Sequence, residues 1–327
     1  MRAIVMREIG GPEVLRLEQV PDPTAGPGQV MIRTEAIGTH FAETRMRAGT
    51  LPGHEPTLPS TPGFEAAGTV VEVGDGVDAA LVGTRVTAMG VDGTGSYAEY
   101  LGLPASGIVV LPDGVSPRDA VAVASQGAVA LGLIRVAALT GDEQILVEAA
   151  GGAVGGYLVQ LARRHGVRRI IATAGTGAKR AFARELGADV AVDHSDPDWP
   201  AAVAKAAGAE RVDVVFESIG GESAGALLDA IAPGGRILLY GLLTDKPPAI
   251  MPVDLFYRGL TLIGCGGMPG DGAWYDTVMA TRADVLADLA AGTVRPLVAD
   301  VLPLAEAAEA HRRLESHEAI GKIILEP

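Results

Sequence analysis

The hydrophobic pattern of the first part of the chain, up to about residue 115, is that of short strands. Apolar residues recur in brief runs separated by Gly, Pro and Asp clusters, and these runs are AIVM, LRLEQV, QVMIRTEAIG, GTVVEVG, GTRVTAMG and SYAEYLGL. Short apolar runs bounded by turn residues are typical of antiparallel sheets. We therefore predict a mostly antiparallel β unit at the start of the chain.

From Ser116 the pattern changes to Ala-rich, helix-length stretches that alternate with short continuous apolar runs. The runs lie at 145–150, 170–174, 190–193, 212–217, 236–241 and 260–264. Buried strands separated by helices indicate βαβ units and a parallel sheet covered on both faces. This part of the chain is predicted to be a doubly wound α/β domain.

The remaining pattern predicts a helix over 274–291, a strand in LVADVL, a helix starting near Leu304 and a last strand over 322–325. This segment is too short to form a domain of its own. We expect it to return and pack on the first β-rich unit.

Composition and charge narrow the class of partner. The chain has 327 residues, which suits two domains, and 48% of them are hydrophobic, which suits an ordered globular protein. Its net charge of -14 would repel nucleic acids and anionic lipid surfaces. We expect a small-molecule substrate.

Three features favour a cytoplasmic protein. The single cysteine, Cys265, forms neither an internal disulfide nor a multi-cysteine zinc lobe. Residues 1–10 carry Glu8 and do not have the apolar core of a signal peptide. The longest apolar run, Ala120 to Leu139, contains Arg135 and is interpreted as a buried helix, so no membrane association is expected.

A dinucleotide-binding pattern starts at the strand QILV, which runs into Ala150-Gly151-Gly152-Ala153-Val154-Gly155 and then an apolar helix. This A-x-G-x-x-G turn would let Gly152 approach a pyrophosphate and Gly155 pack the helix on the strand. The helix N-terminus would attract the phosphates. The alternative is a glycine-rich turn without a ligand.

The next strand distinguishes between the two nicotinamide dinucleotides. An NAD site usually has an acidic residue about 20 positions after the turn, but here the strand ends in Ala174 and Gly175. Lys179 and Arg180 follow and could bind the 2′-phosphate of NADPH, unless they are ordinary solvated charges. His194, just after the third strand, is expected near the same adenosine end.

Together these residues resemble the medium-chain dehydrogenase/reductase superfamily, specifically its zinc-free quinone oxidoreductase branch. The resemblance covers the whole chain through blocks at 37–49, 58–74, 141–162, 212–221, Tyr240-Gly241 and 310–325. It implies a GroES-like β-rich catalytic domain formed by 1–120 and 267–327, a Rossmann NADP(H)-binding domain at 121–266, and a homodimer.

The resemblance also places the metal positions. Zinc-dependent relatives have two cysteines and the histidine of Gly-His-Glu as ligands, and here those positions hold His40, Phe64 and approximately Ser125. One imidazole together with Glu65 does not complete a tetrahedral site, so no metal is expected.

The remaining site residues are also implied by the resemblance. Cofactor contacts are expected from Phe41, Val129, Gly151, Ala153, Val154, Ser218, Tyr240, Gly241, Leu242, Gly264, Cys265 and Lys322, and the substrate pocket from His40, Arg45, Phe64, Met89, Met268 and Trp274. For the pocket residues Met89, Met268 and Trp274, core packing is the competing interpretation. The chain departs from the branch at His40, Glu43, Arg45, Val129 and His194, where the branch has Asn, Asp, Tyr, Thr and Tyr.

The expected activity is hydride transfer from NADPH to quinones or related α,β-unsaturated carbonyl compounds, which are activated by their own conjugation. His40 is the candidate proton donor, and a structural histidine under the nicotinamide is the alternative. An enoyl-thioester reductase and a catalytically reduced NADPH-binding structural or regulatory protein are the competing functions. Tyr97 is expected to be structural, and His54, His165, His311 and His317 are expected at the solvated surface.

Overall fold

The structure is a computed structural model that describes residues 1–90, 95–244, 246–266 and 272–327. It divides into two compact units, which are described separately. Among the described residues, unit 1 comprises those in 1–125 and 282–327, and unit 2 comprises those in 126–266 and 272–281. The helix α9 (Ala273–Ala290) begins in unit 2 and ends in unit 1.

Unit 1 is built on β-strands, as the alternating pattern predicted. Its strands are β1 (Arg2–Val5), β2 (Arg16–Gln19), β3 (Gln29–Gly38), β4 (Glu65–Val73), β5 (Arg85–Met89), β6 (Tyr100–Pro104), β7 (Ile108–Val110), β14 (Val298–Pro303) and β15 (Lys322–Glu326). Its helices are α1 (Phe41–Arg47), α2 (Pro117–Val123) and α10 (Ala307–Glu315), with 3-10 turns η1 (Pro12–Val14), η2 (Ala79–Leu81), η3 (Ala105–Gly107) and η6 (Leu304–Glu306). The sequence analysis did not predict β7.

The larger sheet of unit 1 has the order β14-β15-β3-β4-β5-β7, and β6 also pairs with β3. All pairs are antiparallel except β14 with β15. Ile324 of β15 lies opposite Gly38 of β3, so the C-terminal segment returns to the first β-rich unit as predicted. This pairing brings residues from the two ends of the chain side by side.

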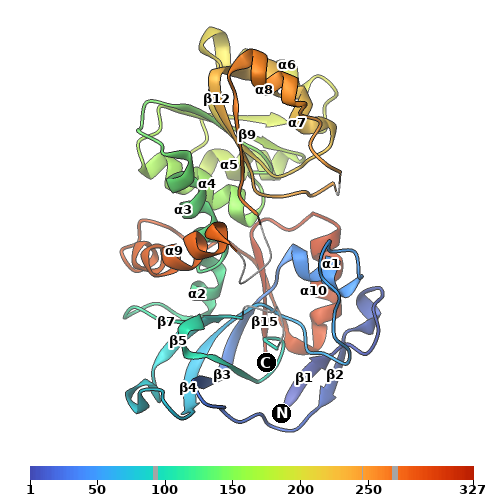
Figure 1. Cartoon of the computed structure of the whole chain (residues 1–327), viewed down its shortest axis with the longest axis vertical. Helices are drawn as coiled ribbons and strands as arrows, with labels where there is room; N and C mark the ends of the chain where they lie inside the picture. Colours follow the sequence, from blue (N-terminus) through green and yellow to red (C-terminus); the bar gives the residue numbers. More distant parts are fainter. Residues whose placement is uncertain (91–94, 245, 267–271) are drawn as a thin grey trace. The chain divides into compact units, whose positions relative to one another are not determined.

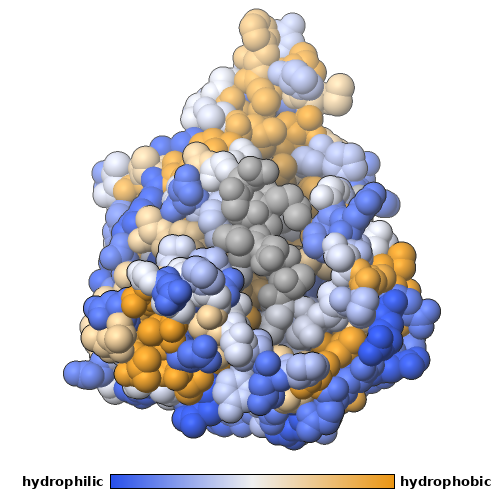
Figure 2. Space-filling model, turned by 60° about the horizontal axis from the view of Figure 1, so that its bottom comes forward, coloured by the Kyte–Doolittle hydropathy of each residue, from blue (hydrophilic) through white to orange (hydrophobic). Residues whose placement is uncertain are grey.

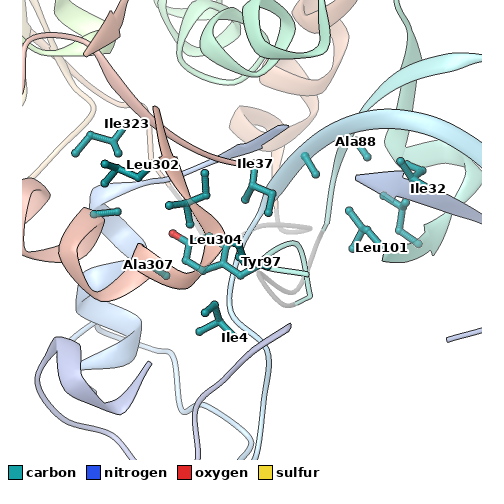
Figure 3. Close-up of a cluster of buried hydrophobic side chains, with 14 of the residues drawn as sticks. Ile4, Ile32, Ile37, Ala88, Tyr97, Leu101, Leu302, Leu304, Ala307 and Ile323 are labelled. Carbon is teal, nitrogen blue, oxygen red and sulfur yellow. The ribbon is translucent and has the colours of Figure 1, made fainter. Parts of the chain in front are cut away.

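The core of unit 1 lies between the sheet and the C-terminal helix. Figure 3 shows Ile32 and Ile37 of β3 in one cluster with Ile323 of β15 and Leu304 of η6. All four side chains are buried, and each such aliphatic side chain contributes about 1.5–3 kcal/mol relative to exposure. The cluster fixes the strand ends that carry the site residues described below.

Unit 2 contains the predicted parallel sheet, with the order β10-β9-β8-β11-β12-β13. The strands are β8 (Gln144–Val147), β9 (Arg169–Ala174), β10 (Val190–Asp193), β11 (Val212–Glu217), β12 (Ile231–Leu239) and β13 (Thr261–Gly264). The helices are α3 (Gln126–Ala137), α4 (Ala153–Arg164), α5 (Gly177–Glu185), α6 (Trp199–Ala207), α7 (Glu222–Ala226) and α8 (Pro252–Arg258), with 3-10 turns η4 (Gly208–Glu210) and η5 (Leu228–Ala230). In Figure 1 the sheet lies among these helices.

The strand order changes direction between β8 and β11. In doubly wound sheets such a switch point, at the carboxyl ends of the strands, is where ligands bind. The residues that follow β8, β9, β11 and β12 therefore form the natural ligand-binding edge of unit 2.

The apolar run that begins at Pro117 is the one helical stretch, among the described residues, that is long and apolar enough to cross a membrane. It forms α2 and α3, and 72% of its most apolar window is buried inside the protein. Core helices of globular proteins have the same composition. By contrast, the surface in Figure 2 is largely hydrophilic (blue) around its lower rim, with smaller hydrophobic groups (orange) between.

Candidate functional site

The glycine-rich turn of unit 2 is a tight connection between β8 and α4. Gly152 is the N-cap residue of α4 and provides no side-chain cap, so the first turn of the helix is left for another acceptor. A Cβ on Gly155 would come within 2.7 Å of the Ala149 carbonyl oxygen, and Ala149 itself adopts φ 49°. Ala153 and Val154 occupy the first turn of α4. The turn thus has the close packing that a dinucleotide pyrophosphate requires.

Lys179 lies beside this turn. A Cβ placed on Gly151 would meet the Cβ, Cγ and Cδ of Lys179 at 2.6–2.7 Å, so the lysine stem lies against the glycine. Thr176 caps α5 by accepting a hydrogen bond from the Lys179 backbone at 3.2 Å. The stem of Lys179 is therefore packed against the glycine-rich turn.

Arg180 has a different environment from that of Lys179. Its guanidinium forms an ion pair with Asp193 at 2.5 Å and also donates to the Ala174 carbonyl at 3.4 Å. His194 lies next to Gly175, since a Cβ there would approach the His194 Nε2 to 2.9 Å. Burial, together with the nearby cations, lowers the pKa of His194 despite the Asp193 charge. The structure thus gathers Ala174, Gly175, Arg180 and His194 at one end of the sheet.

The ends of β11, β12 and β13 hold another group of predicted cofactor residues. Ser218 follows β11 and packs against Gly241, where a Cβ would come within 3.0 Å of the Ser218 carbonyl oxygen. Tyr240 is half-buried, and burial raises the pKa of its hydroxyl. Leu242 is 47% exposed, and Gly264 ends β13.

Cys265 is a buried thiol. Its backbone N–H donates to the Leu239 carbonyl at 2.8 Å, and burial raises the pKa of the thiol to about 11. A neutral thiol is a poor nucleophile. Cys265 can therefore contribute backbone and packing to this edge.

Val129 and Trp274 belong to the helical side of unit 2. Val129 is half-buried on α3, and Trp274 packs on the same helix, where a Cβ on Gly132 would meet its ring at 3.3 Å. This contact favours the packing interpretation of Trp274. Met268 lies outside the described residues.

In unit 1 three side chains from distant parts of the chain meet. The Lys322 Nζ donates to the Glu65 Oε2 at 2.5 Å and lies 3.3 Å from the His40 Nε2, which is itself 3.1 Å from the same carboxylate oxygen. Glu65 and Lys322 are about 1% exposed, whereas His40 is 14% exposed. We call these residues the His40 cluster.

The electrostatics of the His40 cluster favour an ionised carboxylate. Burial alone would raise the pKa of Glu65, but the Lys322 ammonium and His40 hold it below its usual value. The cluster therefore holds a buried negative charge, a buried ammonium and a partly exposed imidazole. Such a group can donate a proton to, and stabilise charge on, an oxygen that contacts His40.

Local structure fixes the orientation of His40. His40 is the N-cap residue of α1, and the Glu43 side chain reaches back to accept from its backbone N–H at 2.8 Å. The other Glu43 oxygen accepts from the Phe64 N–H at 2.9 Å, and the Phe64 ring contacts His40 edge-on at 5.6 Å between centroids. Glu43 thus positions two of the predicted pocket residues.

The other predicted site residues of unit 1 differ in their contacts and burial. Met89 ends β5 opposite Glu65 in the strand register, and it is half-buried. Phe41 follows His40 and contacts the His317 ring at 5.1 Å, and Arg45 is half-buried on α1. A Cβ on Gly38 would fall within 2.7 Å of the ends of the Glu65 and Lys322 side chains, so a larger residue there would displace them.

The expectation that His311 lies at the solvated surface is wrong. His311 is fully buried, and its ring lies 3.1 Å from the Tyr97 hydroxyl and 3.3 Å from Arg47. Tyr97 donates to Glu43 at 2.6 Å, which gives it the structural role that was expected. Burial and the Arg47 charge lower the pKa of His311 to about 3. The charged flanks of His311 in the sequence concealed its inward-facing position on α10.

Sequence reasoning missed the roles of Glu43 and Glu65. Glu65 was weighed only as a metal ligand, and Glu43 only as a departure from the branch. The sequence did contain a signal for Glu65, because it is an acidic residue at the start of an apolar run. A carboxylate in a buried strand requires a partner. Among the described residues, no group of three or more His, Cys, Asp or Glu side chains is arranged to hold a metal ion.

A polar hollow of about 310 Å³ lies at the opposite edge of the unit 2 sheet. Its lining includes Glu143, Asp213 and Arg236, at the amino ends of β8, β11 and β12. None of the predicted site residues takes part in it.

Comparison with known families identifies two matching regions. Residues 26–113 match the family described as alcohol dehydrogenase GroES-like domain, and residues 153–281 match the one described as zinc-binding dehydrogenase. Together they correspond to the β-rich unit and to the doubly wound sheet.

Individual relatives extend over the whole chain. A 2-haloacrylate reductase from Burkholderia sp is 33% identical over 340 residues, covering 99% of this chain and 98% of the relative. A crystal structure of Escherichia coli quinone oxidoreductase complexed with NADPH has a TM-score of 0.90 at 27% identity and covers all of both chains. A crystal structure described as an NAD-dependent alcohol dehydrogenase has a TM-score of 0.88 at 30% identity, again over all of both chains.

Proposed function

Because the chain belongs to the medium-chain dehydrogenase/reductase superfamily and resembles its quinone oxidoreductase branch, we propose that it is an NADPH-dependent reductase of conjugated carbonyl compounds. The acceptors are quinones or related α,β-unsaturated carbonyls, and no zinc takes part. The observation that carries the proposal is the His40 cluster, in which a buried ammonium and an imidazole share one carboxylate.

Unit 2 provides the cofactor site in this proposal. When bound, NADPH supplies a hydride from its nicotinamide ring. The first turn of α4 receives the pyrophosphate, and the Lys179 ammonium attracts the 2′-phosphate, since the end of β9 carries no carboxylate to repel it. The NADPH complex of the Escherichia coli relative supports NADPH as the cofactor. Because another similar structure is described as NAD-dependent, NADH is the control cofactor in the experiment below.

Unit 1 provides the proton. With the hydride supplied by bound NADPH, which would leave as NADP⁺, the electron pair of the conjugated system would pass to the carbonyl oxygen of the acceptor. Protonated His40 would donate a proton to that oxygen and become a neutral imidazole, which Lys322 and Glu65 hold in place. The conjugated acceptor needs no stronger polarisation of its oxygen, because its own π system accepts the electron pair.

The absence of zinc from the reaction follows, in this proposal, from the chemistry of the residues. An ammonium already lies against both His40 and Glu65, which are the two potential ligands at this position. A metal ion would have to displace Lys322 and would still have too few ligands for a tetrahedral site.

The experiment combines cofactor binding with turnover. Fluorescence titration should give a lower Kd for NADPH than for NADH, and Lys179→Met should remove most of that difference. His40→Ala should lower kcat by about 10²–10⁴-fold, the usual contribution of a general acid, with little change in the Kd of NADPH. A chelator should not alter the rate, and a rate that depends on zinc would refute the proposal.

The acceptor class is tested by a panel of quinones, enones, 2-haloacrylates and crotonyl-CoA. We expect turnover of the quinones and enones, because neutral conjugated acceptors do not have to approach a chain of net charge -14 as anions. Turnover of crotonyl-CoA alone would instead identify an enoyl-thioester reductase. Tight NADPH binding without oxidation by any acceptor would identify a binding protein without this activity.

We also propose that the protein is a homodimer. β13 is the last strand in the order of its sheet, and its residue Leu262 is 37% exposed. On α8, which precedes β13, Phe256 and Tyr257 are each 80% exposed. An exposed edge strand beside exposed aromatic side chains is typical of a surface that pairs with a second copy.

A further inference from the structure

Two glutamates lie at the switch point of the unit 2 sheet. Glu148 directly follows β8 and Glu217 ends β11, and these neighbouring strands run in parallel with Val147 opposite Phe216. Both glutamate side chains are fully buried. Two carboxyl groups are thus held together at the base of the ligand-binding edge.

Their hydrogen bonds leave one oxygen on each carboxyl group. Glu217 Oε1 accepts from the backbone of Ile219 at 2.9 Å and of Gly220 at 2.6 Å, and Glu148 Oε1 accepts from the Ser223 hydroxyl at 2.9 Å. Each Oε2 is buried and has no donor among the residues that the structure describes. The two carboxyl groups are close enough for the charge of Glu217 to act on Glu148. Two buried carboxylates on adjacent strands, each with one oxygen that has no donor among the described residues, repel each other when both are ionised, so the pair favours keeping one proton.

The donors decide which carboxyl group holds the proton. The two backbone N–H groups favour the ionised form of Glu217, whereas Glu148 has a single hydroxyl partner. Burial, and then the charge of Glu217, raise the pKa of Glu148 well above its usual range. Burial also raises the pKa of Glu217, although its backbone donors oppose that shift. Glu148 is therefore the carboxylic acid and Glu217 the carboxylate.

We infer that Glu148 and Glu217 share one proton and act as positioning residues for the cofactor, by tying the glycine-rich turn to the loop that follows β11. The inference rests on the proposed function, because it takes that turn to bind NADPH. Ala149, the residue next to Glu148, provides the carbonyl against which Gly155 packs. Any shift of Glu148 is therefore transmitted to the start of α4.

Loss of the shared proton would break this connection. Two buried carboxylates in contact repel each other, and neither can be solvated without moving. The loop after β11 contains Gly220 and Gly221, with φ of 75° and 60°, and is held to β11 by the Glu217 hydrogen bonds. Ionisation of Glu148 would thus separate that loop from the turn.

The other titratable and charged groups around the pair leave this prediction unchanged. Tyr240, after β12, is half-buried, and burial followed by nearby carboxyl charge raises the pKa of its hydroxyl. Lys246 packs its stem over Gly221 but is itself exposed, and Lys179 lies across Gly151 on the other side of the turn. On α7, Glu222 is exposed and only Ser223 reaches the pair.

The test is the pH profile of NADPH affinity, measured by fluorescence titration from pH 7 upward. If only the protonated pair holds the turn, the Kd of the wild-type protein rises about tenfold per pH unit above the pKa of the pair. Glu148→Gln keeps a neutral donor to Glu217 at every pH, so its profile should stay flat. Glu222→Gln, an exposed carboxyl group on the adjacent helix, should follow the wild type.

A second variant keeps the inference testable if Glu148→Gln does not fold. Ser223→Ala removes the hydroxyl that lowers the pKa of Glu148, so the rise in Kd should move to higher pH. In the nucleotide-free protein, infrared spectroscopy at pH 7 should show the carbonyl band of a protonated carboxylic acid, and Glu148→Gln should abolish it.

The outcomes separate this inference from the proposed function. Tight NADPH binding with a flat wild-type profile would refute the positioning role alone. The absence of the infrared band would refute the shared proton, whatever the cofactor. Failure of the wild-type protein to bind NADPH at pH 7 would refute the proposed function and the positioning role with it, while the infrared band would still report the proton.

Discussion

Buried ionisable side chains show at the scale of single residues how charge is controlled in this protein. Glu65, Lys322 and His311 are each enclosed within unit 1, and each has a defined partner. Enclosure makes the charge state depend on the partner and not on the solvent. Mutation of one member should therefore affect stability in a pH-dependent way.

Glu65→Gln should destabilise the protein by about 3–5 kcal/mol near neutral pH, the usual cost of leaving one member of a buried ion pair unpaired. Because the folded-state pKa of Glu65 is lowered, its contribution is present above the ordinary value of 4.5 and is lost as the pH falls through the folded value. Urea unfolding should thus show a difference from wild type that closes in acid. Glu99→Gln, which breaks a more exposed pair with Arg2, should cost less at neutral pH.

His311 should make the protein sensitive to mild acid. Its pKa is lowered to about 3, so stability is complete above the ordinary value of 6.5 and declines as the pH falls from there toward 3. The expected decline is about 1.4 kcal/mol per pH unit. His311→Gln should unfold with a shallower pH dependence between about pH 6 and 5, whereas the half-buried His54→Gln should keep the wild-type slope. Equal slopes in all three proteins would contradict the burial of a neutral His311.

Secondary structure is the scale at which the sequence was most informative. The continuous apolar runs of unit 2 predicted all six strands of its sheet. Strands such as β8 and β9 are buried on both faces and therefore have no polar alternation, whereas β13 has an apolar run although it lies exposed at the edge. β12 nevertheless begins at Ile231, five residues before the predicted run. The prediction started too late because Pro233, Gly234 and Gly235 are residues typical of a turn. β7 was missed because three residues are too few to show a period.

The site was less predictable than the strands, for a physical reason. The glycine-rich turn can be recognised from a short stretch of sequence, because one loop sets the spacing of its glycines. The acidic residues Glu65 and Glu148 depend on residues distant in sequence, Lys322 and Glu217, which only the folded sheets bring near. A single sequence shows the residue type but not the partner.

The packing of α4 on β8 gives a prediction at the scale of elements. Gly155→Ala would force a Cβ within 2.7 Å of the Ala149 carbonyl oxygen and 2.8 Å of the Ala150 Cα, so the helix must move away from the turn. We expect at least a tenfold increase in the Kd of NADPH and a lower Tm. Gly177→Ala, at the first position of α5, has its nearest atom at 3.9 Å and should leave both unchanged. An unaffected Gly155→Ala variant would show that the turn tolerates the shift.

Assembly is the question at the scale of the whole molecule. The aromatic rings of Phe256 and Tyr257 contact each other at 5.3 Å and are otherwise exposed, as expected of residues that pack against a second copy. Replacing both with Ser should weaken dimerisation by about 2 kcal/mol or more per ring. Analytical ultracentrifugation should then detect monomers at concentrations where the wild type is dimeric. Val110→Ser, an exposed residue of β7, is the control.

The pairing of β15 with β3 also has a consequence for synthesis on the ribosome. Residues 29–38 are translated long before residues 322–326, the strand with which they pair. Until that strand arrives, Glu65 has no ammonium beside it, because Lys322 is delivered with it. A product released before residue 322 would contain all of unit 2 and would not have the Lys322–Glu65 pair.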